Sequence, residues 1–302
     1  VTRVQVGVQS TKDYILKKVN RGCTSKDNKI GIRRLKQNGF KTDIHIMADL
    51  PGSTLELDKE VIDEITTDPD YEADQWKFYP TEVTPFTKIK EWYDDGSYTP
   101  YGDDSLKMLE MSIYTMKKVK PYIRLNRVIR DIPHNSILGG VRCSNMRQLA
   151  KNKMIRENIK CVDIREREVK NRDIGDMILD IINYPASGGK EYFIQFCSKN
   201  KEILYGFIRL RINNSFEDSF KCLQGCALIR ELHVFGQDNK IGHKNMNGAQ
   251  HLGLGKKLLK KAEWIASYNK CKKIAVISGV GVRNYYRKRG YNLGKKGYMY
   301  KD

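Results

Sequence analysis

Two glycines at the start of a long amphipathic pattern limit the fold more than any other feature of this chain. The stretch AQHLGLGK contains Gly253 and Gly255 directly before a helix expected over 256–268. Glycine lets the backbone adopt a positive φ and approach a ligand closely, and the amides of a helix N-terminus attract anions. A strand expected over 226–236 precedes the glycines, and another, over 272–279, follows the helix. This order predicts an α/β domain with a pyrophosphate site at the start of the helix.

The helix following the glycines has one apolar side, and its lysines lie on the other. The apolar residues recur three or four positions apart, as in a helix packed on a core: Leu258, Leu259, Ala262, Ile265 and Ala266. A dinucleotide-binding G-x-G-x-x-G site is not favoured, because Leu258 stands where the third glycine is required.

The first half of the chain alternates short apolar strands with helices. We expect strands over 3–10, 41–52, 75–83 and 122–132, and helices over 13–19, 25–39, 57–68 and 104–119. Such alternation predicts a mainly parallel sheet or a partial β/α barrel, in which ligands bind at the carboxyl ends of the strands. Gln9, Asp49 and Tyr79 would lie at that end, unless they are ordinary turn residues.

The pattern changes near residue 150, and we place a domain boundary there, dividing the chain into 1–152 and 153–302. Two alternating apolar runs within 191–213 predict a hairpin. A polar loop over 237–249 then precedes the glycines, and a short helix over 282–290 and a final strand end the chain.

The charge and the cysteines indicate the kind of partner and compartment. Lys and Arg exceed Asp and Glu by 55 to 36, a net charge of +19, which favours polyanions and nucleic acid first. The seven cysteines are odd in number and scattered, so a disulfide framework is not expected and a reducing, cytoplasmic setting is. No apolar run approaches the length of a membrane span, so no membrane partner is expected.

The order Q-x-x-G-x-G, helix, strand and Y-Y-x-x-x-G-Y resembles the GNAT acetyltransferase superfamily. The motifs RELHVFG, QHLGLGKKLL and ISGVGVRNYYRKRGY resemble, more narrowly, the family of the Elongator catalytic subunit. In the first half, GFKTDIHIMADLPG, KFYPT and RVIRDIP resemble the later part of that family's radical S-adenosylmethionine domain. The resemblance implies a partial radical-SAM-like β/α barrel followed by a GNAT-type acetyltransferase domain.

The resemblance implies that acetyl-CoA lies along the strand ending in ELHV and across the helix start. The residues expected to bind it are Glu231, Leu232, His233, Val234, Gln250, Gly253, Leu254, Gly255, Lys256 and Tyr286. Tyr286 is expected to protonate the departing CoA thiolate, with Tyr285 as the alternative. Glu231 and His233 alternate in one strand and share a side, and either could act as a base through water. His233 could equally be a hydrogen-bonded core histidine.

The substrate implied by the resemblance is uridine-34 of the tRNA anticodon stem-loop, which receives a carboxymethyl group at C5. Basic side chains near Tyr122 are expected to contact its phosphates: Lys118, Lys120, Arg124, Arg127 and Arg130. Scattered surface arginines are the alternative. Further Elongator-like subunits or self-association are also expected.

The chain departs from the family pattern at the iron–sulfur cluster. S-adenosylmethionine and a [4Fe–4S] cluster are implied, but the family's C-x4-C-x2-C run is absent and a cluster needs three close thiolates. The chain is therefore either a piece of a longer protein or a naturally short one, and we expect no radical step from it alone.

A zinc site at Cys143 and Cys161 is not favoured, because Arg165 and Arg167 are poor ligands. No metal is predicted. A protein lysine acetyltransferase and a non-catalytic tRNA-binding scaffold remain the alternative functions.

Overall fold

The computed structural model describes residues 1–302 except 130–131, 171, 173–174 and 237–252. The predicted loop 237–249 and two predicted site residues, Gln250 and Arg130, therefore lie outside the described residues. No helix among the described residues is long and apolar enough to cross a bilayer.

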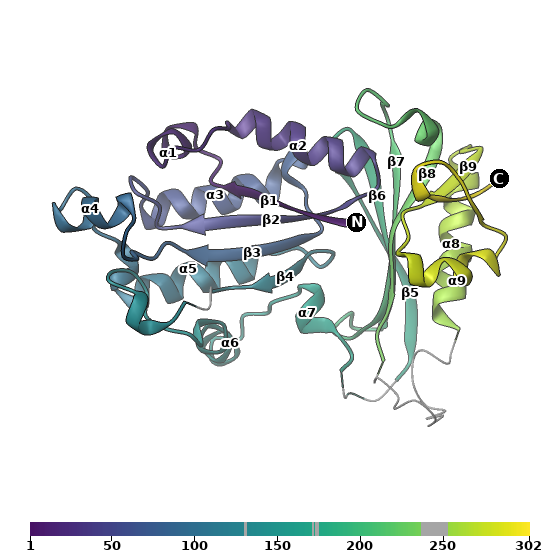
Figure 1. Ribbon diagram of the computed structural model, residues 1–302. Coiled ribbons are helices and arrows are strands. Elements are labelled where there is room, and N and C mark those ends of the chain that lie inside the picture. The colour runs from purple at the N-terminus through teal and green to yellow at the C-terminus, as the bar shows by residue number, and fades with distance from the viewer. Residues whose placement is uncertain (130–131, 171, 173–174, 237–252) are drawn as a thin grey trace. The chain divides into compact units, whose positions relative to one another are not determined.

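The chain divides into two compact units (Figure 1). Unit one comprises residues 1–4, 33–42 and 166–302, and unit two comprises residues 5–32 and 43–165. The units therefore interleave segments of the chain, whereas the predicted domains, 1–152 and 153–302, are continuous.

The first sheet has four strands in the order β1-β2-β3-β4. They are β1 (Arg3–Gln9), β2 (Lys41–Ala48), β3 (Gln75–Pro80) and β4 (Arg124–Arg127). The β2–β3 and β3–β4 pairs are parallel, as the alternation predicted. β4 is shorter than the predicted strand over 122–132, and a register shift between Trp76 and Lys77 interrupts its pairing with β3.

Seven helices accompany this first sheet among the described residues. They are α1 (Asp13–Lys18), α2 (Ser25–Gln37), α3 (Leu55–Thr67), α4 (Lys88–Asp94), α5 (Ser105–Lys118), α6 (Met146–Arg156) and α7 (Ile164–Arg167). Local chemistry sets their ends. The Thr54 side chain accepts the Leu57 amide at the start of α3, and Gly39, at φ +80°, follows the end of α2.

The second sheet has seven strands in the order β10-β11-β9-β8-β7-β6-β5. They are β5 (Met177–Ala186), β6 (Gly189–Ser198), β7 (Leu204–Asn213), β8 (Cys226–Val234), β9 (Lys273–Val276), β10 (Asn292–Leu293) and β11 (Met299–Lys301). All neighbours are antiparallel except β8 and β9, which are parallel. The predicted hairpin is confirmed as β6–β7.

Helix α8 (Leu254–Tyr268) supplies much of the core of unit one, and α9 (Arg283–Arg287) follows β9. The apolar residues predicted for one side of α8 are all buried against the sheet, in a cluster with Ile194, Ile208 and Ile229. The cluster confirms the predicted amphipathic helix and places the start of α8 beside the end of β8.

Candidate functional site

Strands β8 and β9 separate from each other halfway along β8. Their pairing runs from Cys226–Lys273 to Ile229–Val276, and β9 then ends while β8 continues to Val234. The amide of Phe235 donates to the Tyr205 carbonyl of β7. The alternation of an antiparallel ladder therefore directs the backbone groups of Leu232 and Val234 away from β7. No strand among the described residues pairs with this edge beyond the end of β9, so an extended polar chain can pair with it.

A β-bulge sets which side chains of β8 face the core. The register with β7 shifts between Arg209, opposite Glu231, and Leu210, opposite Ile229, so that Arg230 is the extra residue. Beyond the bulge, Leu232 and Val234 pack against the α8 side of the sheet.

The start of α8 lies against this open edge. Gly253 has φ +67°, and no side chain caps the helix. A Cβ at Gly255 would lie 2.8 Å from the Tyr285 hydroxyl and 3.7 Å from Val234 Cγ2. A side chain at position 255 would therefore displace the Tyr285 hydroxyl, and among the described residues no side chain caps the α8 N-terminus.

Four buried polar atoms in the segment between β9 and β10, which includes the Tyr285 hydroxyl beside Gly255, have no hydrogen-bond partner among the described residues. They are Ser278 Oγ, Arg283 Nε, Tyr285 Oη and Arg289 Nε. Buried polar groups in folded proteins almost always have partners. Two arginines and two hydroxyls suit an anionic ligand rich in oxygen, and the residues present therefore fit the acyl-CoA that the resemblance implies.

The two adjacent tyrosines occupy different surroundings. The Tyr286 ring is buried in the core and packs edge-on against Tyr285 and Tyr291, whereas the Tyr285 hydroxyl lies next to Gly255. The Arg289 guanidinium is 3.4 Å from the centre of the Tyr285 ring. Burial raises the pKa of Tyr286, and burial raises that of Tyr285 despite the opposing charge of Arg289. Both phenols keep their protons at neutral pH and can donate them.

Glu231 and His233 lie on one side of β8, as predicted, but differ in character. The Glu231 carboxylate accepts from Lys41 Nζ and Arg209 Nε, each at 3.0 Å. Burial opposes ionisation, but these two cations outweigh it and lower the pKa of Glu231, which makes it a weak base. His233 is exposed, and its ring stacks on Phe207 and packs at a tilt against Phe235, so it is not a core histidine.

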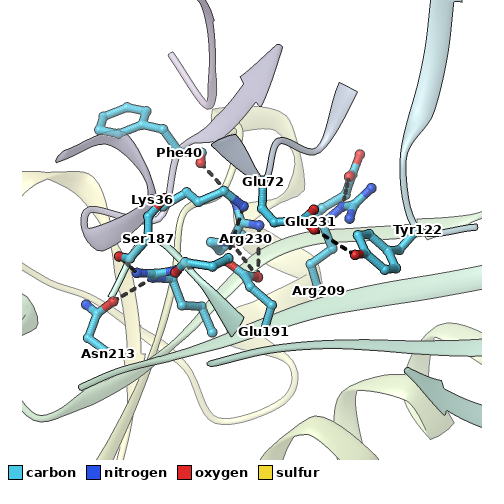
Figure 2. Close-up of polar contacts among 12 residues, drawn as sticks. Lys36, Phe40, Glu72, Tyr122, Ser187, Glu191, Arg209, Asn213, Arg230 and Glu231 are labelled. Carbon is cyan, nitrogen blue, oxygen red and sulfur yellow. Dashed lines mark hydrogen bonds and ion pairs between the residues drawn. The ribbon is translucent and has the colours of Figure 1, made fainter. Parts of the chain in front are cut away.

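The residues expected to contact RNA near Tyr122 do not form one free basic patch. Lys118 Nζ lies 2.6 Å from Asp63, and Lys120 pairs with Glu72. Tyr122 is buried and donates its hydroxyl hydrogen to Glu72 (Figure 2). These contacts occupy the two lysines within the fold.

Arg124 lies in β4 and is half-buried, and Arg127 is exposed at the end of that strand. Arg127 also lines the cavity described next. The two arginines therefore stand in different surroundings, although they are only three residues apart.

A cavity of about 700 Å³ lies at the carboxyl ends of β1, β2 and β3 in unit two. Predicted Gln9 and Tyr79 line it, together with His45, Trp92 and Arg127. Gln9 Oε1 and His45 Nε2 are buried without partners among the described residues. Burial, and secondarily the charge of Lys77, lower the pKa of His45, so its imidazole is neutral at pH 7.

Asp49, expected beside Gln9 and Tyr79, instead holds loops together. It is buried, and its two carboxylate oxygens accept the amides of Tyr101 and Gly102 at 3.0 and 2.7 Å. Its own amide donates to Asp58, and its carbonyl accepts the Tyr98 hydroxyl. The role of Asp49 is therefore to position the loops around the strand ends.

The titration of Asp49 predicts a pH dependence of stability. Burial raises its pKa from 3.8 to about 7, against the two donor amides. The pKa of Asp49 is therefore higher in the folded state than in the unfolded state. Between pH 3.8 and about 7 the folded state binds more protons, so the protein's stability falls as the pH rises across this range. We expect the stability of the wild type relative to Asp49→Asn to increase when the pH is lowered from 8 to 5. Urea midpoints at each pH measure this, and a constant difference would contradict it.

The seven cysteines do not form a cluster site. All are free, and the described residues contain no group of three or more His, Cys, Asp or Glu that could hold a metal ion. The chain therefore does not fit the [4Fe–4S] cluster that the resemblance implies, and we derive no step through one.

A buried ionic cluster in unit one was not foreseen from the sequence. The Glu191 carboxylate forms ion pairs with Lys36 Nζ at 3.5 Å, Arg211 Nη1 at 3.1 Å and Arg230 Nη2 at 2.9 Å. All four side chains are buried (Figure 2). Charged residues inside apolar strands, Glu191 in EYFIQF and the alternating arginines of IRLRI, were the available signal. The Arg230 guanidinium also donates to the Phe40 carbonyl, which anchors the bulge of β8.

Comparison with known proteins gives consistent matches. Residues 73–156 match the Radical_SAM C-terminal domain family. A tRNA uridine(34) acetyltransferase from Dehalococcoides mccartyi is 38% identical over 99% of this chain and 66% of its own length. The bovine Elongator complex protein 3 is 37% identical over 97% of this chain and 54% of its own length. The chain thus spans between about half and two thirds of these curated relatives.

The solved structure of archaeal Methanocaldococcus infernus Elp3 with an N-terminal deletion matches all of this chain and 72% of its own, with a TM-score of 0.90 and 36% identity. The fold and the family match define a mixed α/β protein with a radical-SAM C-terminal domain. More particularly, the chain belongs to the family of tRNA uridine(34) acetyltransferases and Elongator complex protein 3.

Proposed function

We propose that this chain is the acetyl-CoA-binding part of an enzyme that forms a carboxymethyl group on uridine-34 of tRNA. In this proposal a GNAT-type acetyltransferase domain (153–302) follows a partial radical-SAM-like β/α barrel (1–152). The observation that carries it is the open edge of β8 beside an uncapped helix start and four unpartnered polar atoms. The names of the relatives supply the proposed substrate.

Acetyl-CoA would supply the acetyl group as a thioester. Its pantetheine arm would pair with the backbone of Leu232 and Val234, and its pyrophosphate would accept the amides of Leu254 and Gly255. Arg283 and Arg289 would add positive charge beside those phosphates. Proposed as binding residues on the resemblance alone are Gln250, which is not described, and Lys256.

The two tyrosines would divide two tasks. Tyr286, buried and protonated, would hold the proton for the departing thiolate. The Tyr285 hydroxyl, beside Gly255, would donate a hydrogen bond to the bound cofactor near the helix start. Glu231 is paired with Lys41 and Arg209, so its proposed role is to hold the end of β8 in place and not to act as a base. Exposed His233 is the better candidate for a base acting through water.

The cavity of unit two would accept the target nucleoside. A neutral His45 and the carboxamide of Gln9 offer a donor and acceptors for the edge of a pyrimidine ring, and Trp92 and Tyr79 offer aromatic faces. Arg127 at its rim would contact the RNA backbone, and Arg124 and Arg130 are proposed with it. Lys118 and Lys120 are weaker candidates because they are already paired.

S-adenosylmethionine, further Elongator-like subunits and self-association belong to the proposal through the family alone. The free cysteines are in keeping with a cytoplasmic enzyme. The net charge of +19 supports a polyanionic substrate and weighs against basic protein tails, which a lysine acetyltransferase would have to attract.

The test is acetyl-CoA hydrolysis by the chain with and without tRNA, for the wild type and two single variants. We expect tRNA to stimulate hydrolysis. Tyr286→Phe should lower kcat by roughly 100-fold, which is within the usual contribution of a general acid. Tyr285→Phe should instead raise KM for acetyl-CoA with little change in kcat, because it removes a binding contact.

The pattern of outcomes separates the alternatives. If Tyr285→Phe lowered kcat and Tyr286→Phe raised KM instead, the two tyrosines would have the opposite roles. CoA release with acetylation of a lysine-containing peptide, and no stimulation by tRNA, would support the protein acetyltransferase. Binding of tRNA without any acetyl-CoA binding would leave a non-catalytic scaffold.

A further inference from the structure

The solvent-facing side of α8 carries a set of residues of which only Lys256 is also proposed for the acetyl-CoA site. Successive residues of a helix are about 100° apart around its axis, so these residues lie within an arc of about 140° on the side opposite the buried apolar residues. They are Lys256, Lys257, Lys260, Lys261, Trp264 and Tyr268, and we call them the α8 outer face.

The lysines of the α8 outer face are not neutralised. Among the described residues, no carboxylate lies within ion-pair distance of any of the four. The single acidic residue of α8, Glu263, is occupied by Lys301 Nζ and the Tyr291 hydroxyl, both at 2.9 Å. The outer face therefore presents four positive charges along a little over one turn of helix.

Two aromatic rings extend this basic face toward the helix C-terminus. Trp264 and Tyr268 are 55% and 76% exposed. Their rings are 5.5 Å apart and only 17° from parallel, and Lys261 Nζ lies 3.8 Å from the centre of the Trp264 ring. The two rings stack on each other in water, with Lys261 over the face of Trp264, and form an aromatic platform that no other described residue covers.

We propose that the α8 outer face is a docking surface for RNA, with bases stacking on Trp264 and Tyr268 and phosphates contacting the lysines. RNA is the partner that needs both features, because it combines negative charge with exposed π faces. An acidic protein would use the charges without the paired rings. A bilayer would need aliphatic side chains beside the aromatics, and those of α8 are buried in the core.

This inference rests on the proposed tRNA substrate and assigns part of its binding to unit one. The acetyl-CoA site uses the N-terminal amides of α8, whereas RNA would use the outer face of the same helix. Because the two sites share only Lys256, bound acetyl-CoA would leave the rest of the α8 outer face accessible to RNA.

The experiment measures binding of a fluorescently labelled anticodon stem-loop RNA to the chain at several salt concentrations. Trp264→Ala should weaken binding about tenfold, the usual effect of removing one stacking platform. Lys257→Gln combined with Lys260→Gln should reduce the slope of log K against log salt by about 1.4, at about 0.7 per phosphate. RNA should quench tryptophan fluorescence less in Trp264→Phe than in the wild type, where Trp264 contributes in addition to Trp92 of the cavity.

The matched control is Lys221→Gln combined with Lys295→Gln, two exposed lysines of the same unit, which should leave the slope and affinity near wild type. The proposal would be overturned if the double lysine variant weakened RNA binding but Trp264→Ala did not. It would also be overturned if polyglutamate competed with the labelled RNA as strongly as unlabelled RNA does. RNA binding by the wild type that both α8 variants retain would also overturn it and leave the proposed function standing. Absence of RNA binding by the wild type would overturn the proposed substrate itself.

Discussion

Replacing Gly255 with glutamate is expected to lower the affinity for acetyl-CoA by at least roughly 100-fold, because a buried like charge opposite a phosphate costs several kcal/mol. The new carboxylate would stand at the start of α8, where the pyrophosphate is proposed to bind. Its Cβ would also meet the Tyr285 hydroxyl at 2.8 Å. Calorimetric titration with acetyl-CoA measures the loss, and the affinity for tRNA should remain near wild type.

Two further variants show whether the loss comes from the site or from misfolding. Gly31→Glu introduces the same side chain into α2, where an added Cβ meets nothing within 4 Å, and should leave acetyl-CoA binding unchanged. Gly255→Ala should be destabilised by the contact with Tyr285, and adding Tyr285→Phe should restore its stability. Equal loss of acetyl-CoA and tRNA affinity in Gly255→Glu would show that the fold had failed instead.

Glu191→Gln is expected to destabilise unit one by about 4 kcal/mol, in the range found when one member of a buried ion pair is removed. The glutamine has no charge to offset Lys36, Arg211 and Arg230, which would remain buried. The Arg211 guanidinium would keep its bonds to the Ala186 and Ser187 carbonyls, so the variant should unfold earlier rather than adopt another packing. Chemical denaturation followed by circular dichroism measures the change.

The control for this substitution is Asp176→Asn. It breaks an ion pair with Lys199 in which both side chains are mostly exposed, and exposed pairs contribute little. Its stability should match wild type. A Glu191→Gln chain as stable as Asp176→Asn would mean that the buried cations find other partners.

The elements that could be predicted from sequence are those set by local periodicity. The apolar stripe of α8 and the hairpin of β6 and β7 follow from short-range patterns, and the structure has both. The alternation expected within the hairpin is not seen in burial, because β6 and β7 are largely buried on both sides. Gly253 and Gly255 were placed correctly at the helix start for the same reason. The binding roles of the residues on either side of the helix start could be assigned only from a family resemblance, because a glycine pair alone is common in turns.

The features that could not be predicted depend on long-range contacts. Nothing near Lys36 or Lys41 indicates that their partners are Glu191 and Glu231. The basic residues near Tyr122 were predicted from charge alone, and charge does not reveal that Lys118 and Lys120 already have carboxylate partners. Asp49 was placed at the correct strand end, but the amides that orient its carboxylate come from a loop about fifty residues later.

The interleaving of the two units bears on how the chain acquires its fold during synthesis. Residues 33–42 belong to unit one, and Lys36 is separated from Glu191 by 155 positions. At a ribosomal rate of about 5–20 residues per second, this segment would wait on the order of ten seconds or more for its partners. Unit one would therefore complete its folding only after its C-terminal strands have been synthesised.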